Sequence, residues 1–272
     1  MPEPQAAQPA SPLNLLRPLL LLSYSAFYLI PTIYESILNF NFKVFQSFDN
    51  FKDAWFARFW TFFGPKSRQF AEPSVMPLLK NAASGVCLDI GPGSGEWLYL
   101  FGKANNGGIT KIYGVEPNIG MHAQLRESAV KAGLGDIYEI VGCGAEELST
   151  RGGIQKESID TIITVQCLCS IPAPERIIKE LYPLLKSGGK WLVYEHVRTK
   201  YQGNFVGYWQ RKCEQGSGLI ERFADLEFRG HQPDLAYFLQ RMRHHKTDRR
   251  VVAASWGVAR GKTEAWRRRG PL

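Results

Sequence analysis

The middle of the chain alternates short apolar runs with longer polar segments. Each run is four to eight residues long, which is typical of strands buried in a sheet. The segments between them carry glycine-rich turns and helix-like patterns, so the sequence predicts an α/β fold with a parallel sheet and helices on both faces. Five strands are expected: Val86–Ile90, Ile112–Val115, Tyr138–Val141, Ser158–Val165 and Trp191–Val197. Two weaker runs, Ala224–Arg229 and Val251–Val258, are candidates for a sixth and a seventh strand.

The N-terminal part of the chain begins with a polar lead and continues into an uncharged stretch. Residues 1–12 are rich in Pro, Ala and Gln and predict a disordered lead. Pro18–Tyr34 then holds 17 residues without a charge, the lower limit for a helix that crosses a bilayer. We expect a membrane anchor or a monotopic hairpin here, with Pro31 kinking or ending the helix. A core helix docked on the domain and a secretory signal are the alternatives, although no convincing cleavage site follows.

Eleven aromatic residues lie between Phe40 and Phe63, many of them three or four positions apart with charged residues between them. This spacing predicts an amphipathic helix with an aromatic face, which suits a bilayer interface or a lid over a substrate pocket. Gly64 and Pro65 are expected to end that helix. We therefore expect four parts: a lead at 1–12, an anchor with the aromatic helix at 13–64, a catalytic domain at 65–240 and a basic segment at 241–272.

Composition and charge narrow the possible functions. Of the 272 residues, 44% are hydrophobic and 21% are charged, as in globular proteins. The net charge of +8 comes from residues 241–272, which hold 10 basic and 2 acidic residues. Such a segment is a solvated tail or is attracted to an anionic membrane surface. No basic face with interleaved aromatics lies inside the folded part, so we expect no nucleic-acid partner.

The first predicted strand ends in the glycine-rich turn GPGSG, formed around Gly91, Gly93 and Gly95. Glu96 stands where a dinucleotide-binding motif has its third glycine. Asp89, two residues before the turn, would repel a pyrophosphate but attract an ammonium group. The turn therefore favours S-adenosyl-L-methionine, which carries a sulfonium and an ammonium in place of phosphates.

Further candidate cofactor contacts follow the second and third strands. Glu116 ends the second strand 21 residues after the last turn glycine, where a carboxylate accepts both ribose hydroxyls of NAD or of S-adenosylmethionine. Pro117 and Asn118 come next and would flank the adenine. After the third strand, the small residues of Gly142–Ala145 let adenine approach the backbone, and an acid, Glu146 or Glu147, would accept its amino group.

The cysteines predict neither a metal site nor a disulfide framework. Cys167 and Cys169 follow the fourth strand as a C-x-C pair, which supplies two ligands at most and has no nearby partners to complete a zinc site. The chain has five cysteines, scattered through apolar runs. They fit small buried residues in a reducing compartment.

The motifs LDIGPGSG, GVEPN, GAEEL, SIDTIIT and LLKSGGKWLVYEH, in this order, resemble class I S-adenosylmethionine-dependent methyltransferases with a seven-stranded Rossmann-like sheet. The resemblance covers Gly85 to about Gln210. CLCSI, SGGKWLVYEHV and FVGYWQ are similar to the membrane-anchored thiol S-methyltransferases of endoplasmic reticulum and lipid droplets. This closer resemblance implies methyl transfer to small, often apolar thiols, with residues 1–64 supplying the membrane address. Cysteine usage and the cofactor's location favour the cytosolic face.

The resemblance also implies roles for individual residues. Asp89 and the turn glycines would line the methionine end of the cofactor, Glu116 would hold the ribose, and Gln166 and Cys167 would lie at the mouth of the site. His196, at the carboxyl end of the fifth strand, is the candidate base for the thiol, although a histidine beside Glu195 is more often a hydrogen-bonded pair that fixes a loop. After Gln210 the family's tryptophan-proline and glycine-cysteine segments are absent, which leaves the substrate pocket less defined.

Three other functions stay open at this point. A pocket on the membrane side also suits methylation of a quinone, a sterol or a phospholipid headgroup. A catalytically silent adenosine-binding membrane protein would explain the altered C-terminal segment. An NAD-dependent oxidoreductase is opposed by Asp89 and Glu96 and by the lack of a Tyr-x-x-x-Lys pair. The methyl acceptor and the oligomeric state do not follow from the sequence.

Overall fold

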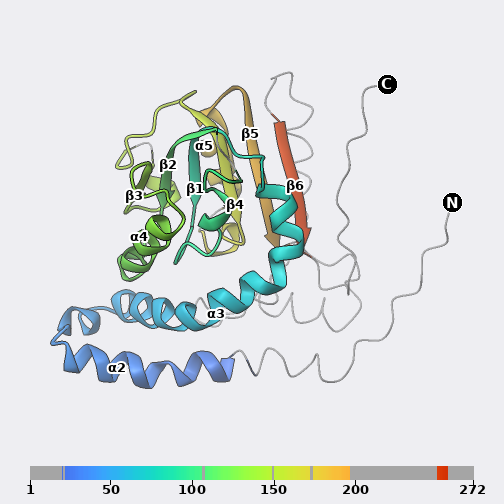
Figure 1. The fold of residues 1–272 in the computed structure, drawn as a ribbon. Coiled ribbons are helices and arrows are strands. Elements are labelled where there is room, and N and C mark those ends of the chain that lie inside the picture. The colour runs from blue at the N-terminus through green and yellow to red at the C-terminus, as the bar shows by residue number, and fades with distance from the viewer. Residues whose placement is uncertain are drawn as a thin grey trace, which may run out of the picture.

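A computed structural model describes residue 20 and residues 22–105, 108–148, 150–171, 174–196 and 250–256. Its centre is a six-stranded parallel sheet in the order β3-β2-β1-β4-β5-β6 (Figure 1). The strands are β1 (Gly85–Ile90), β2 (Ile109–Val115), β3 (Tyr138–Val141), β4 (Ile159–Val165), β5 (Leu185–His196) and β6 (Arg250–Trp256). The chain direction across the sheet reverses between β1 and β4, where ligands bind in open sheets of this kind.

All five expected strands are confirmed, and the parallel α/β fold with them. The structure begins β2 and β5 earlier than expected, at Ile109 and Leu185. The weak run at 251–258 is also confirmed, as β6 beside β5. The other weak run, at 224–229, lies outside the described residues, so the seventh strand stays a prediction.

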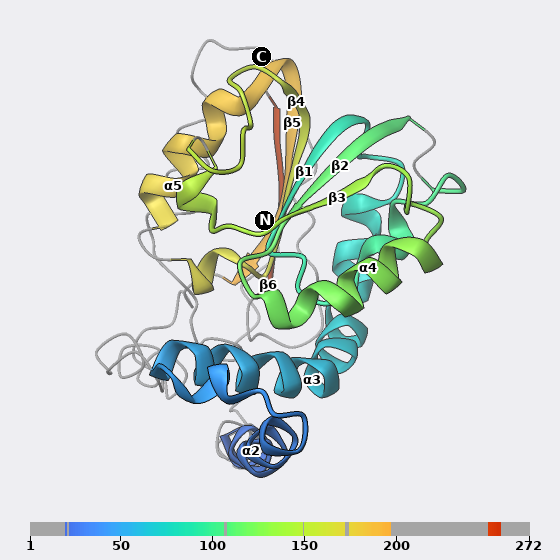
Figure 2. The same ribbon diagram turned by 90° about the vertical axis from the view of Figure 1, so that its left-hand side faces the viewer.

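Helices cover both faces of the sheet. Helix α5 (Pro174–Leu181) lies on one face and α4 (His122–Lys131) on the other (Figure 2). Each face has its own buried apolar cluster: Ile177 and Ile178 of α5 pack with β1 and β4 on one side, and Leu125 of α4 packs with Cys87 and Ile112 on the other. The described 3₁₀ turns are η1 (Phe42–Phe45), η2 (Leu98–Leu100), η3 (Ile119–Met121), η4 (Ala145–Glu147), η5 (Leu168–Ser170) and η6 (Tyr182–Leu184).

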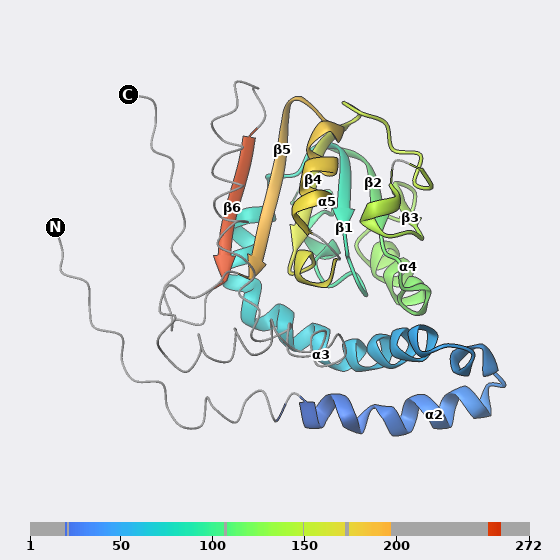
Figure 3. The same ribbon diagram turned by 180° about the vertical axis from the view of Figure 1, so that it is seen from behind.

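A long helix, α3 (Phe48–Leu79), joins the N-terminal part to the sheet. Its N-cap is Ser47, whose hydroxyl accepts the backbone N–H of Asn50 at 3.1 Å. In Figures 1 and 3 the helix runs past the carboxyl ends of the strands and then turns up beside the sheet. Val75 and Leu79, near its C-terminal end, are fully buried against the sheet.

Two expectations about this region were wrong. The aromatic segment does not form one helix from residue 40, because residues 42–45 make the separate turn η1. Gly64 and Pro65 do not end the helix, which continues through Pro65, Pro73 and Pro77. A proline inside a helix removes one hydrogen bond and bends the axis. Burial of the helix on the sheet outweighs that cost, so α3 crosses the predicted boundary at residue 64.

Helix α2 (Leu29–Leu38), which precedes α3 in the chain, lies side by side with it in Figures 1 and 3. The indole N–H of Trp55 donates to the carbonyl of Ser25 at 2.7 Å, and Arg58 forms an ion pair with Glu35. A turn at Tyr28 interrupts the helical run three residues before Pro31, which confirms the break expected there. Within the described residues, each helix is too short or too polar to span a membrane.

Candidate active site

The glycine turn after β1 lies where the strand order of the sheet reverses. It packs against the loop after β4 and against helix α3. Gly91, Gly93 and Gly95 have φ of 64°, 58° and 83°, which is the left-handed region that favours glycine. A Cβ atom on Gly91 would lie 2.7 Å from the Cβ of Cys167. One on Gly93 would lie 2.9 Å from Nε1 of Trp60 in α3. The turn therefore needs glycine both for its backbone and for its close neighbours.

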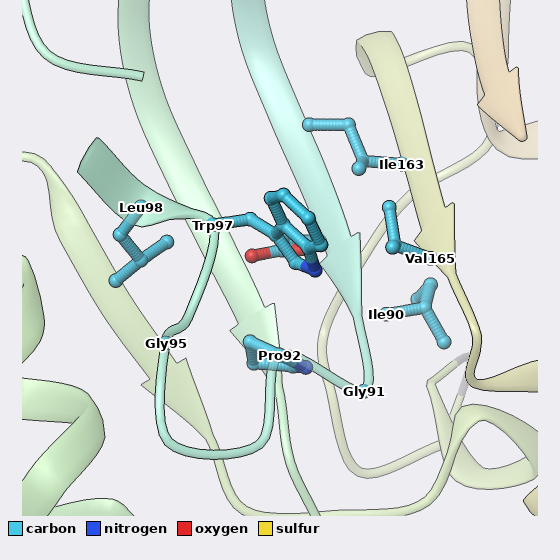
Figure 4. Close-up of a pocket in the computed structure, with 9 residues that line it drawn as sticks. Ile90, Gly91, Pro92, Gly95, Trp97, Leu98, Ile163 and Val165 are labelled. Carbon is cyan, nitrogen blue, oxygen red and sulfur yellow. The ribbon is translucent and has the colours of Figure 1, made fainter. Parts of the chain in front are cut away.

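Asp89 lies in β1, just before this turn, with its carboxylate almost entirely buried. Burial raises the pKa of Asp89 to about 7, opposed by the hydroxyl of Tyr138, which donates to Oδ2 at 3.3 Å. Asp89 lines a small pocket with the glycine turn, Trp97 and Ile163 (Figure 4). A cation entering this pocket would favour the ionised carboxylate and lower its pKa.

Glu116 directly follows β2, at the strand end where the sequence placed it, and its side chain is buried. Its carboxylate accepts the backbone N–H of Gly93 at 3.0 Å and that of Asn118 at 2.9 Å. Burial raises the pKa of Glu116, and these hydrogen bonds and nearby His122 oppose the rise. A carboxylate has about four acceptor positions, so this one retains the capacity for a pair of hydroxyl donors.

A third buried carboxylate, Glu195, lies near the end of β5 and is a site residue that the sequence did not predict. It accepts the backbone N–H groups of Cys167 at 3.2 Å and Leu168 at 3.3 Å, and the Cys167 thiol lies 3.5 Å away. Burial raises the pKa of Glu195 to about 7, although these hydrogen bonds lower it. Glu195 therefore fixes the loop after β4, the role that sequence reasoning had offered for a pairing with His196.

Helix α3 forms a roof over the site, because it contacts the loops after β1, β2 and β4. Arg68 lies 3.6 Å from Glu96 after the glycine turn. The amide of Asn118, after β2, donates to the carbonyl of Asp53 at 2.9 Å. The hydroxyl of Ser67 lies 3.4 Å from the amide oxygen of Gln166, after β4. These contacts hold the aromatic helix across the edge where the candidate residues converge.

The remaining candidates lie at the same edge of the sheet. Pro117 is exposed beside Glu116, while Ala145 is buried and Glu146 exposed in the turn after β3. Gln166 has a positive φ of 53° directly after β4. His196 is the last residue of β5, and its side chain lies outside the described part of the chain. The parallel sheet thus brings the strand-end candidates to one edge, and their roles stay predictions.

Residues 65–245 match the family model described as a methyltransferase domain. The chain belongs to this family. Two curated relatives are a phosphatidylethanolamine N-methyltransferase of Cereibacter sphaeroides, 27% identical over 116 residues, and a rat thiol S-methyltransferase, 35% identical over 57 residues. These matches cover 43% and 21% of this chain, and only 53% and 23% of the two relatives.

Solved structures with a similar fold are also known. One is a putative S-adenosyl-L-methionine-dependent methyltransferase of Methanococcus maripaludis, with 17% identity, a TM-score of 0.39 and coverage of 60% of this chain and 81% of that one. Another is the YcgJ protein of Bacillus subtilis, with 17% identity, a TM-score of 0.43 and coverage of 53% and 58%. Both TM-scores lie below 0.5, so the membership of this methyltransferase in its family rests on the domain match.

The family implies S-adenosyl-L-methionine as cofactor, and the residues at the sheet edge fit it. Glu116 has acceptor capacity left for two ribose hydroxyls. Asp89 lines the neighbouring pocket and suits an ammonium or sulfonium. Gly93 lets the indole of Trp60 pack directly against the turn, since a Cβ there would lie 2.9 Å from its Nε1. The predicted methionine-end and ribose residues therefore fit this cofactor, and their individual roles stay predictions.

Proposed function

We propose that this methyltransferase transfers a methyl group from S-adenosyl-L-methionine to a small apolar acceptor, preferably a thiol, at a membrane surface. The observation that carries the proposal is the position of α3, whose aromatic face lies across the cofactor edge. Phe56 and Trp60 stack with ring centroids 5.7 Å apart, and Trp60 packs against the glycine turn. An acceptor held under such a roof meets an apolar surface beside the methyl donor.

The chemistry asks little of the protein beyond positioning. The cofactor supplies a methyl group that is already activated on a sulfonium, so the chain must hold the acceptor in line with it and accept the thiol proton. We propose His196 as the base that accepts the thiol proton, because it ends β5 at the same edge as the glycine turn. The similarity to the rat thiol S-methyltransferase over 57 residues supports a thiol acceptor.

An assay of the full-length chain with matched acceptors tests the proposal. Thiophenol and phenol have the same ring and differ in the attacking atom, so both are offered with S-adenosyl-L-methionine, and methylated products are measured by mass spectrometry. We expect methyl phenyl sulfide and little anisole, because the thiol loses its proton more readily. Turnover of phenol alone, or of neither compound while S-adenosylhomocysteine still binds, would contradict thiol methylation.

A second candidate acceptor is a phospholipid amine. It is favoured by the match over 116 residues to a phosphatidylethanolamine N-methyltransferase. Vesicles that contain phosphatidylethanolamine are therefore included in the same assay, with phosphatidylcholine vesicles as the control. If N-methylated lipid forms and the sulfide does not, the phospholipid amine is the acceptor and the thiol is not. If the cofactor binds but no product forms, the chain is better explained as a catalytically silent adenosine-binding protein.

The membrane part of the proposal rests on the outer surface of α2. This helix buries its small polar residues Thr32 and Ser36 and exposes apolar ones, with Ile30 70% and Ile37 51% exposed. Twelve of the sixteen exposed large hydrophobic side chains in the described residues lie between residues 20 and 48. A helix with its apolar side chains outward suits a bilayer interface. We place the chain on the cytosolic face of the endoplasmic reticulum or of lipid droplets.

Flotation of the full-length chain with liposomes tests this placement. We expect the wild type to float with the vesicles and the Ile30→Asp, Ile37→Asp double variant to stay behind. Both positions are exposed, so the change leaves the contacts of α2 with α3 in place. The control replaces two exposed residues of the catalytic domain, Ile119 and Val130, by Asp. Equal flotation of all three proteins would contradict membrane binding through α2.

A further inference from the structure

The indole N–H of Trp60 is a buried hydrogen-bond donor at the candidate site. Within the part of the chain that the structure describes, Trp60 Nε1 is buried and has no hydrogen-bond partner. It lies on the side of α3 that faces the glycine turn, 2.9 Å from the position that a Cβ on Gly93 would take. By contrast, Trp55 on the same helix donates its indole N–H to the carbonyl of Ser25. Buried donors of native proteins are usually paired, so Trp60 calls for an acceptor.

The glycine turn itself has no spare glycine amide for an anion. The N–H of Gly91 donates to the carbonyl of Val115 at 2.9 Å, and that of Gly95 to the carbonyl of Pro92 at 2.9 Å. The N–H of Gly93 donates to Glu116 at 3.0 Å. A negatively charged group that enters above the turn therefore finds the donor of Trp60 rather than these amides.

The cofactor brings such a group. With its ribose held by Glu116, its amino-acid end, which carries one ammonium and one carboxylate, would be held by the glycine turn and Asp89. Asp89 suits the ammonium, which leaves the carboxylate in need of a donor. The nearby carboxylate of Glu96 is engaged by Arg68 at 3.6 Å and by the hydroxyl of Ser94 at 3.1 Å.

We propose that the indole N–H of Trp60 donates a hydrogen bond to the carboxylate of the cofactor's amino-acid end. Helix α3 is then a part of the cofactor site, because its Trp60 binds the charged end of the ligand. This inference rests on S-adenosyl-L-methionine as cofactor, and it assigns to Trp60 a role that is independent of the methyl acceptor.

Calorimetric titration of the full-length chain tests the hydrogen bond from both sides. The variant Trp60→Phe removes the N–H and keeps an aromatic ring. The two ligands are S-adenosylhomocysteine and its decarboxylated form, in which hydrogen replaces the carboxylate. We expect Trp60→Phe to weaken binding of S-adenosylhomocysteine roughly tenfold to a hundredfold, because a charge-assisted bond is lost, and to leave binding of the decarboxylated ligand unchanged. We expect the matched control Trp55→Phe, on the same helix, to leave the affinity for both ligands unchanged.

Each other outcome overturns a definite statement. Equal weakening of both ligands by Trp60→Phe would mean that the ring only packs against the cofactor, and no weakening of either would remove Trp60 from the site. A wild-type chain that binds neither ligand would instead overturn the cofactor assignment. If the variant does not fold, nitrogen-15 spectra of the wild-type indoles decide: one indole proton should move downfield with S-adenosylhomocysteine but not with the decarboxylated ligand. Absence of such a signal would also contradict the bond.

Discussion

The hydroxyl of Tyr138 on β3 reaches the carboxylate of Asp89 on β1 across the strand between them. The donor and acceptor oxygens are 3.3 Å apart, and the intervening residue of β2 is Gly114, which pairs with Asp89 in register. A Cβ on Gly114 would lie 2.1 Å from the Tyr138 oxygen. Glycine at this position therefore leaves room for a side chain two strands away to stabilise the ionised form of Asp89 against the effect of burial.

Replacing Tyr138 by Phe removes the hydrogen bond that stabilises the ionised carboxylate of Asp89. The pKa of Asp89 then rises further above its value of about 7, and less carboxylate is available to a cationic ligand at neutral pH. We expect binding of S-adenosylhomocysteine at pH 7 to weaken about threefold to tenfold and to recover above pH 8. Calorimetric titration between pH 6 and 9 measures this shift, with Tyr113→Phe as the control. An unchanged pH profile would separate Asp89 from cofactor binding, as would unchanged affinity in Asp89→Ala.

Replacing Glu116 by Gln tests the ribose contact. Gly93 donates to one carboxylate oxygen and Asn118 to the other, so the amide keeps an acceptor for only one of these N–H groups, and it also loses the charge. We expect S-adenosylhomocysteine to bind roughly tenfold to a hundredfold more weakly, with the fold retained. Isothermal calorimetry with adenosine as a second ligand measures the effect, because adenosine keeps the ribose and lacks the amino-acid end. Glu139→Gln, at an exposed position of β3, is the control, and a loss confined to S-adenosylhomocysteine would argue against ribose binding by Glu116.

Replacing Gly91 by Ala tests how closely the glycine turn packs against the loop after β4. Gly91 and Gly133 have similar positive φ, 64° and 71°, but a Cβ on Gly133 meets nothing within 4 Å. Gly133→Ala should therefore cost about 1 kcal/mol for the backbone alone. Gly91→Ala also forces its Cβ to within 2.7 Å of Cys167, so we expect an additional loss of about 1–3 kcal/mol in the free energy of unfolding. Urea denaturation measures the free energy of unfolding of both variants. Equal losses would mean that the loop after β4 moves away from the new Cβ at no cost in stability.

Glu195 makes the stability of the free protein dependent on pH. Its pKa is about 7 in the folded chain against an ordinary 4.5, so the folded state binds the proton more tightly than the unfolded state. The stabilisation is complete below pH 4.5 and is lost as the pH rises through 7. We expect the free energy of unfolding of the wild type, relative to Glu195→Gln, to fall by roughly 1–3 kcal/mol between pH 4.5 and pH 8.

Urea denaturation at several pH values measures that difference. Asp89 contributes with the same sign in both proteins, so it cancels in the comparison. The exposed variant Glu139→Gln should run parallel to the wild type. Parallel curves for the wild type and Glu195→Gln would show that folding does not change the pKa of Glu195.

The sequence by itself determined the elements whose signals are local. Five strands, the glycine turn and Glu116 at the end of β2 follow from apolar runs and from residue types at fixed spacing. Once the strands are parallel, their carboxyl ends must meet at one edge, so Asp89, Cys167 and His196 could be assigned to that edge without coordinates. Backbone geometry accounts for this success, because strands and turns are decided within a few residues.

Only the tertiary structure decided what crosses between elements. The prolines of α3 predict a helix end, yet burial of Val75 and Leu79 on the sheet keeps the helix continuous. The contacts from Tyr138 to Asp89 and from Trp60 to the glycine turn join residues 49 and 33 positions apart in the chain. Such pairs leave no periodic pattern, because packing and burial set them rather than local backbone preference. Burial in the folded chain raises the pKa of Asp89, the contact with Tyr138 opposes that rise, and the contact of Trp60 places α3 over the site.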